Sequence, residues 1–205
     1  MSGPRLRILQ AVAKWSRNID RGKIILMRTS GGLVRRPSIR LKDFDYSGPA
    51  SFFITICTAD RRCTLGAVHE DSVILTSDGE VVREQWLISS SVRPGVILDE
   101  FVIMPNHLHA ILFIPSPPEE SSGARCAPLQ RKRRSLGALV GGFKSRVTSI
   151  LRKNHCNPML SPWQVGFHDE IIWNSRKLDR LREYVRQNPA RWPEDSYFAV
   201  HADRL

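Results

Sequence analysis

A long apolar run at residues 101–114, broken near its middle by the turn residues Pro105 and Asn106, constrains the fold of this chain more than any other feature. Short apolar runs bounded by turn residues are typical of buried strands, so the run predicts two adjacent antiparallel strands. Side chains on a strand alternate between its faces, and His107 and His109 therefore project from the same face of the second strand. Such a pair is compatible with half of a metal site or with two hydrogen-bonded core histidines.

The rest of the chain supplies further strands and helices by their hydrophobic periodicity. We expect strands at 51–58, 66–68, 72–75, 96–104, 107–114 and 167–173, and helices at 77–89, 135–153 and 175–188. Ser175 is the expected N-cap of the last helix, and Pro189 stops it. This order predicts an α+β fold, with an antiparallel sheet backed by helices on one face. Glycines at 137, 141 and 142 fit either tight packing against the sheet or close approach to a nucleic acid.

Positive charge is concentrated in two segments. The formal net charge is +11, yet residues 1–43 hold 11 Lys/Arg against two Asp, and residues 125–153 hold nine Lys/Arg and no acid. The remainder is therefore net acidic. Concentrated basic segments suit a polyanion, because neutralising phosphates releases condensed counterions; solvated tails or a membrane-surface patch are the alternatives. The candidate DNA-binding residues are Arg131, Lys132, Arg133, Arg134, Lys144 and Arg146.

Composition restricts the class of protein. No apolar stretch reaches the ~18 residues that a transmembrane helix needs, and charged residues interrupt the start of the chain, so neither a membrane span nor a secretory leader is expected. The four cysteines form no Cys-x-x-Cys pair and are expected to be reduced thiols of a cytoplasmic protein. We expect a basic N-terminal extension at 1–38, one domain at 39–195 with a flexible loop at 115–134, and a C-terminal tail at 196–205.

A second candidate group lies on the last predicted helix. Tyr184 and Asn188 are four residues apart and share a helix face beside the apolar stripe. Taken alone, each has a structural interpretation, as a core tyrosine and as a helix stop before proline. The same choice applies to four aromatic residues that could stack on bases but more simply fill the core: Trp163, Phe167, Trp173 and Trp192.

The ordered set of motifs resembles the HUH single-tyrosine transposases, specifically the branch of REP-associated tyrosine transposases. The resemblance spans roughly residues 35–193 and rests on residues 101–109, with their His-Leu-His, followed by Tyr-Val-Arg-Gln-Asn-Pro at 184–189. Further matching segments are 39–46, 53–58, 135–145, 163–164 and 188–192. Where relatives commonly carry arginine, this chain has Val165 and Trp173, two positions expected to touch DNA.

The resemblance implies a ferredoxin-like or RRM-like HUH endonuclease fold and a set of roles. His107, His109 and Asn188 would coordinate a divalent cation, Mg²⁺ or Mn²⁺. Tyr184 would attack a phosphorus atom in single-stranded or hairpin DNA of the repetitive palindromic type, leaving a 5′-phosphotyrosine. The DNA partner implies a nucleoid-associated protein, acting as a monomer or homodimer.

Two other functions remain open at this point. One is a non-catalytic nucleic-acid-binding module on the same sheet architecture, with structural histidines. The other is a small metalloenzyme with a water nucleophile. The pairing of Tyr184 with Asn188 favours the transposase, because neither alternative needs that tyrosine.

Overall fold

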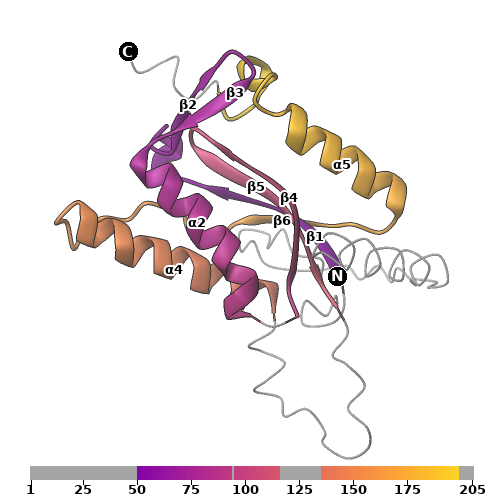
Figure 1. The fold of residues 1–205 in the computed structure, drawn as a ribbon, viewed down its shortest axis with the longest axis horizontal. Coiled ribbons are helices and arrows are strands. Elements are labelled where there is room, and N and C mark those ends of the chain that lie inside the picture. The colour runs from indigo at the N-terminus through magenta and orange to yellow at the C-terminus, as the bar shows by residue number, and fades with distance from the viewer. Residues whose placement is uncertain (1–49, 94, 116–134, 199–205) are drawn as a thin grey trace, which may run out of the picture.

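A four-stranded antiparallel sheet with the strand order β4-β5-β1-β6 forms the centre of the computed structural model, which describes residues 50–93, 95–115 and 135–198 (Figure 1). A separate hairpin, β2-β3, lies beside it. The elements follow in the order β1 (Ala50–Cys57), η1 (Ala59–Arg61), β2 (Gly66–His69), β3 (Ser72–Leu75), α2 (Ser77–Val92), β4 (Ile97–Met104), β5 (His107–Ile114), α4 (Leu136–Asn154), β6 (His168–Ile171), α5 (Ser175–Gln187) and η2 (Trp192–Glu194). The predicted α+β class is confirmed, and each expected strand and helix is present.

Strands β1 and β5 divide the interior into two cores because their side chains alternate. Phe52 of β1 and Leu112 of β5 belong to the larger core, which α2 and α4 cover. Ile111 of β5 faces the other way and packs with Leu178 and Val185 of α5. Helices therefore cover both faces of the sheet, as Figure 1 shows, and the expectation of helices on one face was wrong. The reason is that α5 has an apolar stripe, which is buried against the second face of the sheet.

A bulge in β4 fixes α5 on that second face. The register with β5 shifts between Leu98 and Phe101, and the two residues in between are acidic. Asp99 accepts from Arg182 Nε of α5 at 2.7 Å, with both side chains mostly buried. Glu100 accepts from Arg186 Nη2 at 3.0 Å. A bulge changes the direction in which its side chains point. Here the two acidic side chains bind α5 at Arg182 and Arg186, one on each side of position 184.

Side-chain caps define where the three long helices begin. Thr76 accepts from Gly79 N, and Ser135 accepts from Ala138 N. Helix α5 is capped by Asn174, whose side chain accepts from Lys177 N, so the predicted cap at Ser175 was wrong by one residue. Asn side chains satisfy a free amide of the first helical turn as well as serine does. The helix ends at Gln187, directly before the Asn-Pro pair, as predicted.

Tight packing against the sheet, one of the two explanations offered for the glycines, fits neither Gly141 nor Gly142. A Cβ at Gly141 would meet nothing within 4 Å, so this glycine does not pack against the sheet. A Cβ at Gly142 would lie 2.8 Å from Arg93 Nη2. That same Nη2 donates to Ala138 O at 2.6 Å, which ties α4 to the end of α2. Gly142 therefore makes room for an arginine.

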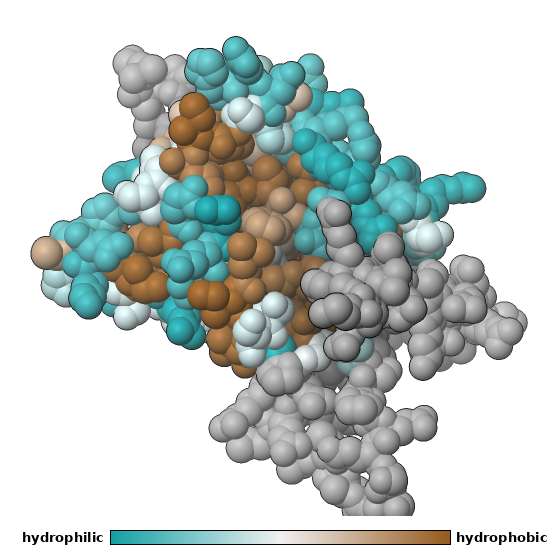
Figure 2. Space-filling model, viewed as in Figure 1, coloured by the Kyte–Doolittle hydropathy of each residue, from teal (hydrophilic) through white to brown (hydrophobic). Residues whose placement is uncertain are grey.

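Some expectations lie outside the described residues. These are the basic extension at 1–38, the loop residues 116–134 and the tail from 199 onward. Cys57, Cys63 and Cys156 are free thiols, as predicted. No helix in the described part of the chain is long and apolar enough to cross a membrane. In Figure 2, hydrophilic residues cover the outer side of α5, whereas hydrophobic residues show around α2 and the β2-β3 hairpin.

The start of α2 gives a direct test of close packing. A Cβ on Gly79 would lie 1.9 Å from Leu65 O, a backbone atom that cannot move aside. We expect Gly79→Ala to lower the free energy of unfolding by about 1–3 kcal/mol, as overpacking does. Gly141→Ala, in open space on α4, should instead raise it by roughly 0.5–1 kcal/mol. Urea unfolding measures the free energy of unfolding of both variants. Equal changes in the two would contradict the close packing of Gly79 against Leu65.

Candidate active site

The first half of the site is the histidine pair at the start of β5. His107 and His109 face the α5 side of the sheet, with 0% and 2% of their surfaces exposed, and their ring centroids lie 4.3 Å apart. All eight residues of β5 are buried, because the strand is paired on both sides, by β4 and by β1. The pair is thus held on a rigid interior strand, as the alternation predicted.

Hydrogen bonds orient the His107 ring. Asn106 Nδ2 donates to two carbonyl oxygens, Arg61 O and Tyr197 O, each at 3.1 Å. The Asn106 Oδ1 atom is therefore an acceptor, and His107 Nδ1, 2.8 Å away, donates its proton to it. The lone pair of this imidazole is consequently on Nε2. That atom is buried and finds no hydrogen-bond partner among the described residues.

The His109 ring is oriented by β1. Thr55 Oγ1 lies 2.8 Å from His109 Nδ1, and the two residues face each other in the β1–β5 register. This contact leaves His109 Nε2 for the interior of the site. Partners of this kind, a hydroxyl or an amide on the far nitrogen of an imidazole, are what metal-binding histidines use to fix ring orientation.

Both imidazoles are neutral at physiological pH. Burial, with a contribution from the charge of Arg61, lowers the pKa of His107 to about 3, while the Asn188 side chain acts in the opposite direction. Burial also lowers the pKa of His109 to about 3, assisted by His107 and opposed by Asp195. A neutral imidazole is the form that binds a metal. The site is therefore prepared for a cation without first losing protons.

The C-terminal end of α5 and the segment after it supply oxygen atoms. Asn188 is 2% exposed, and its Oδ1 atom is buried with no hydrogen-bond partner among the described residues. Its Nδ2 atom donates to Asp195 Oδ2 at 3.3 Å. Asp195 follows η2, and its carboxylate, His107 and His109 offer three ligand atoms that all lie within 4.8 Å of one another. Two imidazoles, a carboxylate and an amide oxygen suit a divalent cation.

Tyr184 reaches the same place from α5. Its hydroxyl lies 3.4 Å from His109 Nε2, its ring contacts the His109 ring at 5.4 Å between centroids, and 37% of its surface is exposed. Burial raises the pKa of the Tyr184 phenol, Asp195 raises it further, and Asn188 opposes them. The Tyr184 side chain is thus partly exposed, with its hydroxyl beside the histidines. It is a weak nucleophile until positive charge enters the site.

One chain therefore brings together His107, His109, Tyr184 and Asn188, the four residues singled out from the sequence. Of the predicted DNA-binding residues, the structure describes Lys144 and Arg146, which belong to α4 on the opposite side of the sheet. Lys144 Nζ donates to Gln164 O and Gly166 O, and Arg146 is exposed. The candidates at positions 131–134 lie outside the described residues. Of the four aromatic residues, Trp163 and Trp192 are buried and Phe167 and Trp173 are half-buried, which favours their core role.

Sequence reasoning missed Asp195, Asn106, Thr55 and Tyr197. Tyr197, in the segment expected to be a tail, stacks its ring 4.6 Å from that of His107. The sequence did hold a signal for Asp195, because a carboxylate seven residues after an expected oxygen ligand is itself a candidate for a hard cation. Asn106 was seen only as a turn residue. Its position next to His107 is the signal that it could orient the ring.

Comparisons with known proteins find a relative in sequence and several similar solved structures. No family model matches. An uncharacterized protein of Haemophilus influenzae is 33% identical over 178 residues, covering 82% of this chain and 96% of that protein. A solved REP-associated tyrosine transposase bound to a REP hairpin aligns with a TM-score of 0.48 at 20% identity, over 75% of this chain and 73% of that one. A candidate transposase from Deinococcus radiodurans R1 aligns with a TM-score of 0.37 at 15% identity, over 78% and 95%.

The carboxylate of Asp195 can be tested as a ligand against its neighbour. We expect Asp195→Asn to weaken Mn²⁺ binding at least tenfold, because a charged ligand becomes a neutral one, whereas Glu194→Gln should leave it unchanged. Glu194 is the matched control because it is an exposed carboxylate one residue away. Calorimetric titration measures both affinities. An equal loss in the two variants would show that general charge, not ligation, attracts the ion.

Proposed function

The chain belongs to the same family as the Haemophilus influenzae protein, and from the chemistry of its own site we propose that it is a metal-dependent transposase that cleaves and rejoins single-stranded or hairpin DNA. The observation that carries the proposal is the position of the Tyr184 hydroxyl, 3.4 Å from His109 Nε2. A phenol beside two neutral imidazoles and a carboxylate has the arrangement of a nucleophile next to a metal site.

The residues at the site fit a divalent cation. His107 Nε2 and Asn188 Oδ1 are both buried acceptors without a donor among the described residues, and burying such atoms unpaired costs free energy. His107, His109, Asp195 and Asn188 would hold the ion. Bound there, Mg²⁺ or Mn²⁺ would polarise the scissile phosphate and offset the charge that develops on it. The oxygen ligands favour these hard ions, and the imidazoles favour Mn²⁺ over Mg²⁺.

Tyr184 performs the covalent step. Its phenolic oxygen attacks the phosphorus and forms a P–O bond, while the bond from phosphorus to the 3′ oxygen of the preceding nucleotide breaks. The phenol proton leaves to water, and the departing 3′ oxygen takes up a proton. A 5′-phosphotyrosine remains, and a 3′-hydroxyl can reverse the reaction to rejoin strands, so no high-energy cofactor is needed. The pKa of Tyr184 is raised, and the nearby positive charge of a cation held by the four ligand residues would lower it.

DNA as the substrate is supported by charge and by exposure. The net charge of +11 attracts a polyanion, and a DNA-handling protein of this kind would act in the cytoplasm at the nucleoid. The Tyr184 side chain is partly exposed, so a DNA strand can approach it from solvent. A non-catalytic nucleic-acid-binding module remains the second candidate, and it would not need a tyrosine hydroxyl directed at the histidines.

Covalent trapping separates the two functions. The full chain is incubated with labelled single-stranded hairpin oligonucleotides and Mn²⁺, and the products are resolved on a denaturing gel. We expect a protein–DNA adduct that Tyr184→Phe abolishes. Tyr197→Phe is the matched control, because Tyr197 also lies against the histidine pair, and this variant should still form the adduct.

Two results would overturn the proposal. Absence of any adduct across a broad oligonucleotide panel, with DNA binding intact, would leave the binding module as the better account. An adduct that survives Tyr184→Phe would assign the nucleophile to another residue.

A further inference from the structure

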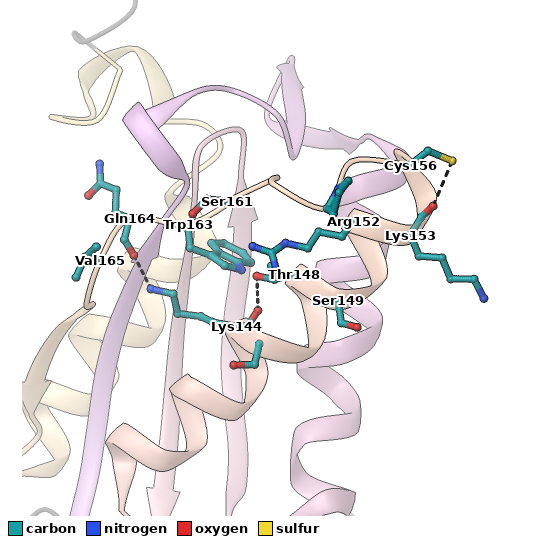
Figure 3. A pocket seen from close by; sticks show the side chains of 12 residues that line it. Lys144, Thr148, Ser149, Arg152, Lys153, Cys156, Ser161, Trp163, Gln164 and Val165 are labelled. Carbon is teal, nitrogen blue, oxygen red and sulfur yellow. Dashed lines mark hydrogen bonds between the residues drawn. The ribbon is translucent and has the colours of Figure 1, made fainter.

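A second concave surface lies between α4 and the loop that follows it. This groove has a volume of about 800 Å³, within the roughly 300–1,000 Å³ of ordinary ligand pockets and larger than a lone phosphate requires. Figure 3 shows side chains of α4 on one wall and residues of the loop on the other. Twelve residues line the groove, among them Lys144, Ser149, Arg152, Lys153, Trp163 and Gln164. It is separate from the histidine site, which lies on the α5 face of the sheet.

The lining carries positive charge without a counter-charge. Lys144, Arg152 and Lys153 are cations, and none of the twelve lining residues is acidic. Lys144 and Arg152 are held in place by carbonyl oxygens rather than by carboxylates: Lys144 Nζ lies 2.6 Å from Gln164 O, and Arg152 Nε lies 2.8 Å from Leu160 O. Their charges therefore remain available to a ligand. Fixed cations next to hydroxyl groups are a common setting for phosphate.

The wall also holds an unsatisfied donor. Trp163 is 7% exposed, and its indole Nε1 is buried with no acceptor among the described residues. A buried N–H without an acceptor costs free energy unless an acceptor is supplied. The wall of the groove therefore holds at least one donor that no described acceptor satisfies.

The rim suits a strand with unpaired bases. Val165 is fully exposed beside Gln164, and Pro158 lines the opposite end of the same loop. Apolar surface next to cations fits single-stranded nucleic acid, which offers both phosphates and the flat faces of its bases. A duplex presents mainly its phosphates at a surface.

The groove leads toward the histidine site. Gln164, whose carbonyl holds Lys144, donates through its backbone N–H to Cys57 O at 3.0 Å. Cys57 is the last residue of β1 and lies directly opposite His107 in the β1–β5 register. A DNA strand that leaves the groove past Gln164 therefore meets the end of the sheet at which β1 stops and β5 begins with His107.

We propose that this groove binds the phosphodiester backbone of the single-stranded DNA that flanks the cleavage point. The assignment rests on the proposed function for the identity of the strand. The groove positions the DNA strand, and the covalent reaction takes place at Tyr184 on the opposite face of the sheet.

The test measures binding alone, in the full chain carrying Tyr184→Phe and in the presence of EDTA, so that neither cleavage nor metal contributes. The probe is a labelled 20-nucleotide unstructured single strand, titrated at several salt concentrations. Arg152→Gln with Lys153→Gln removes two groove cations. We expect the slope of log affinity against log salt to fall by about 1.4, since each phosphate contact on a single strand contributes about 0.7.

Two further variants make the result specific. Arg176→Gln with Arg180→Gln removes the same charge from exposed positions on α5 and should change the slope much less. Ser149→Glu places a carboxylate in the groove at an exposed position, and it should weaken binding even if loss of the Arg152 contact disturbs the loop.

An unchanged slope in the groove variant, or an equal fall in the α5 variant, would overturn the assignment. A matched loss for duplex DNA of the same length would also overturn it, because the groove would then read phosphates without regard to unpaired bases. A reduced slope for the single strand, together with no covalent adduct in the trapping assay, would leave the groove standing and remove the proposed function.

Discussion

Two hydrogen bonds to the Nδ1 atoms of a buried histidine pair are the interactions on which the site depends. Asn106 and Thr55 hold the two rings on a strand that has no freedom to move, since β5 is paired on both sides. Burial keeps both rings neutral, with pKa values of about 3. The Nε2 atoms are thereby presented to the interior of the site, where an oxygen-bearing segment from a distant part of the chain meets them.

The other elements of the fold position Tyr184 and the oxygen-bearing segment beside the histidines. The bulge of β4 anchors α5 through Asp99 and Glu100, so Tyr184 and Asn188 approach the histidines from the second face of the sheet. Beyond the helix, η2 returns the chain and places Asp195 beside the pair. On the first face of the sheet, which α2 and α4 cover, the cations of α4 line the groove instead. The proposed metal site and the proposed DNA-binding groove thus lie on opposite faces of the sheet, and the end of β1 lies between them.

Local patterns predicted what depends on local geometry. Alternation on β5 placed His107 and His109 together, and a four-residue spacing placed Tyr184 with Asn188, because both relations follow from the repeat of a single element. Asp195 could not be found this way, since its position depends on how the chain turns after Pro189 and on the burial of Trp192. Charge suggested Lys144 as a DNA contact but could not reveal the two carbonyl oxygens that hold it. The N-cap differed by one residue because Asn174 and Ser175 are both good caps.

The proposed site requires one metal ion that binds both histidines through nitrogen. Pulsed electron paramagnetic resonance of the full chain with Mn²⁺ detects coupling of the electron spin to ligand ¹⁴N nuclei and counts the imidazoles. We expect coupling to two imidazole nitrogens, reduced to one in His107→Gln and in His109→Gln. Bound Mn²⁺ without nitrogen coupling would show that the ion binds elsewhere, and it would return His107 and His109 to the role of structural core residues.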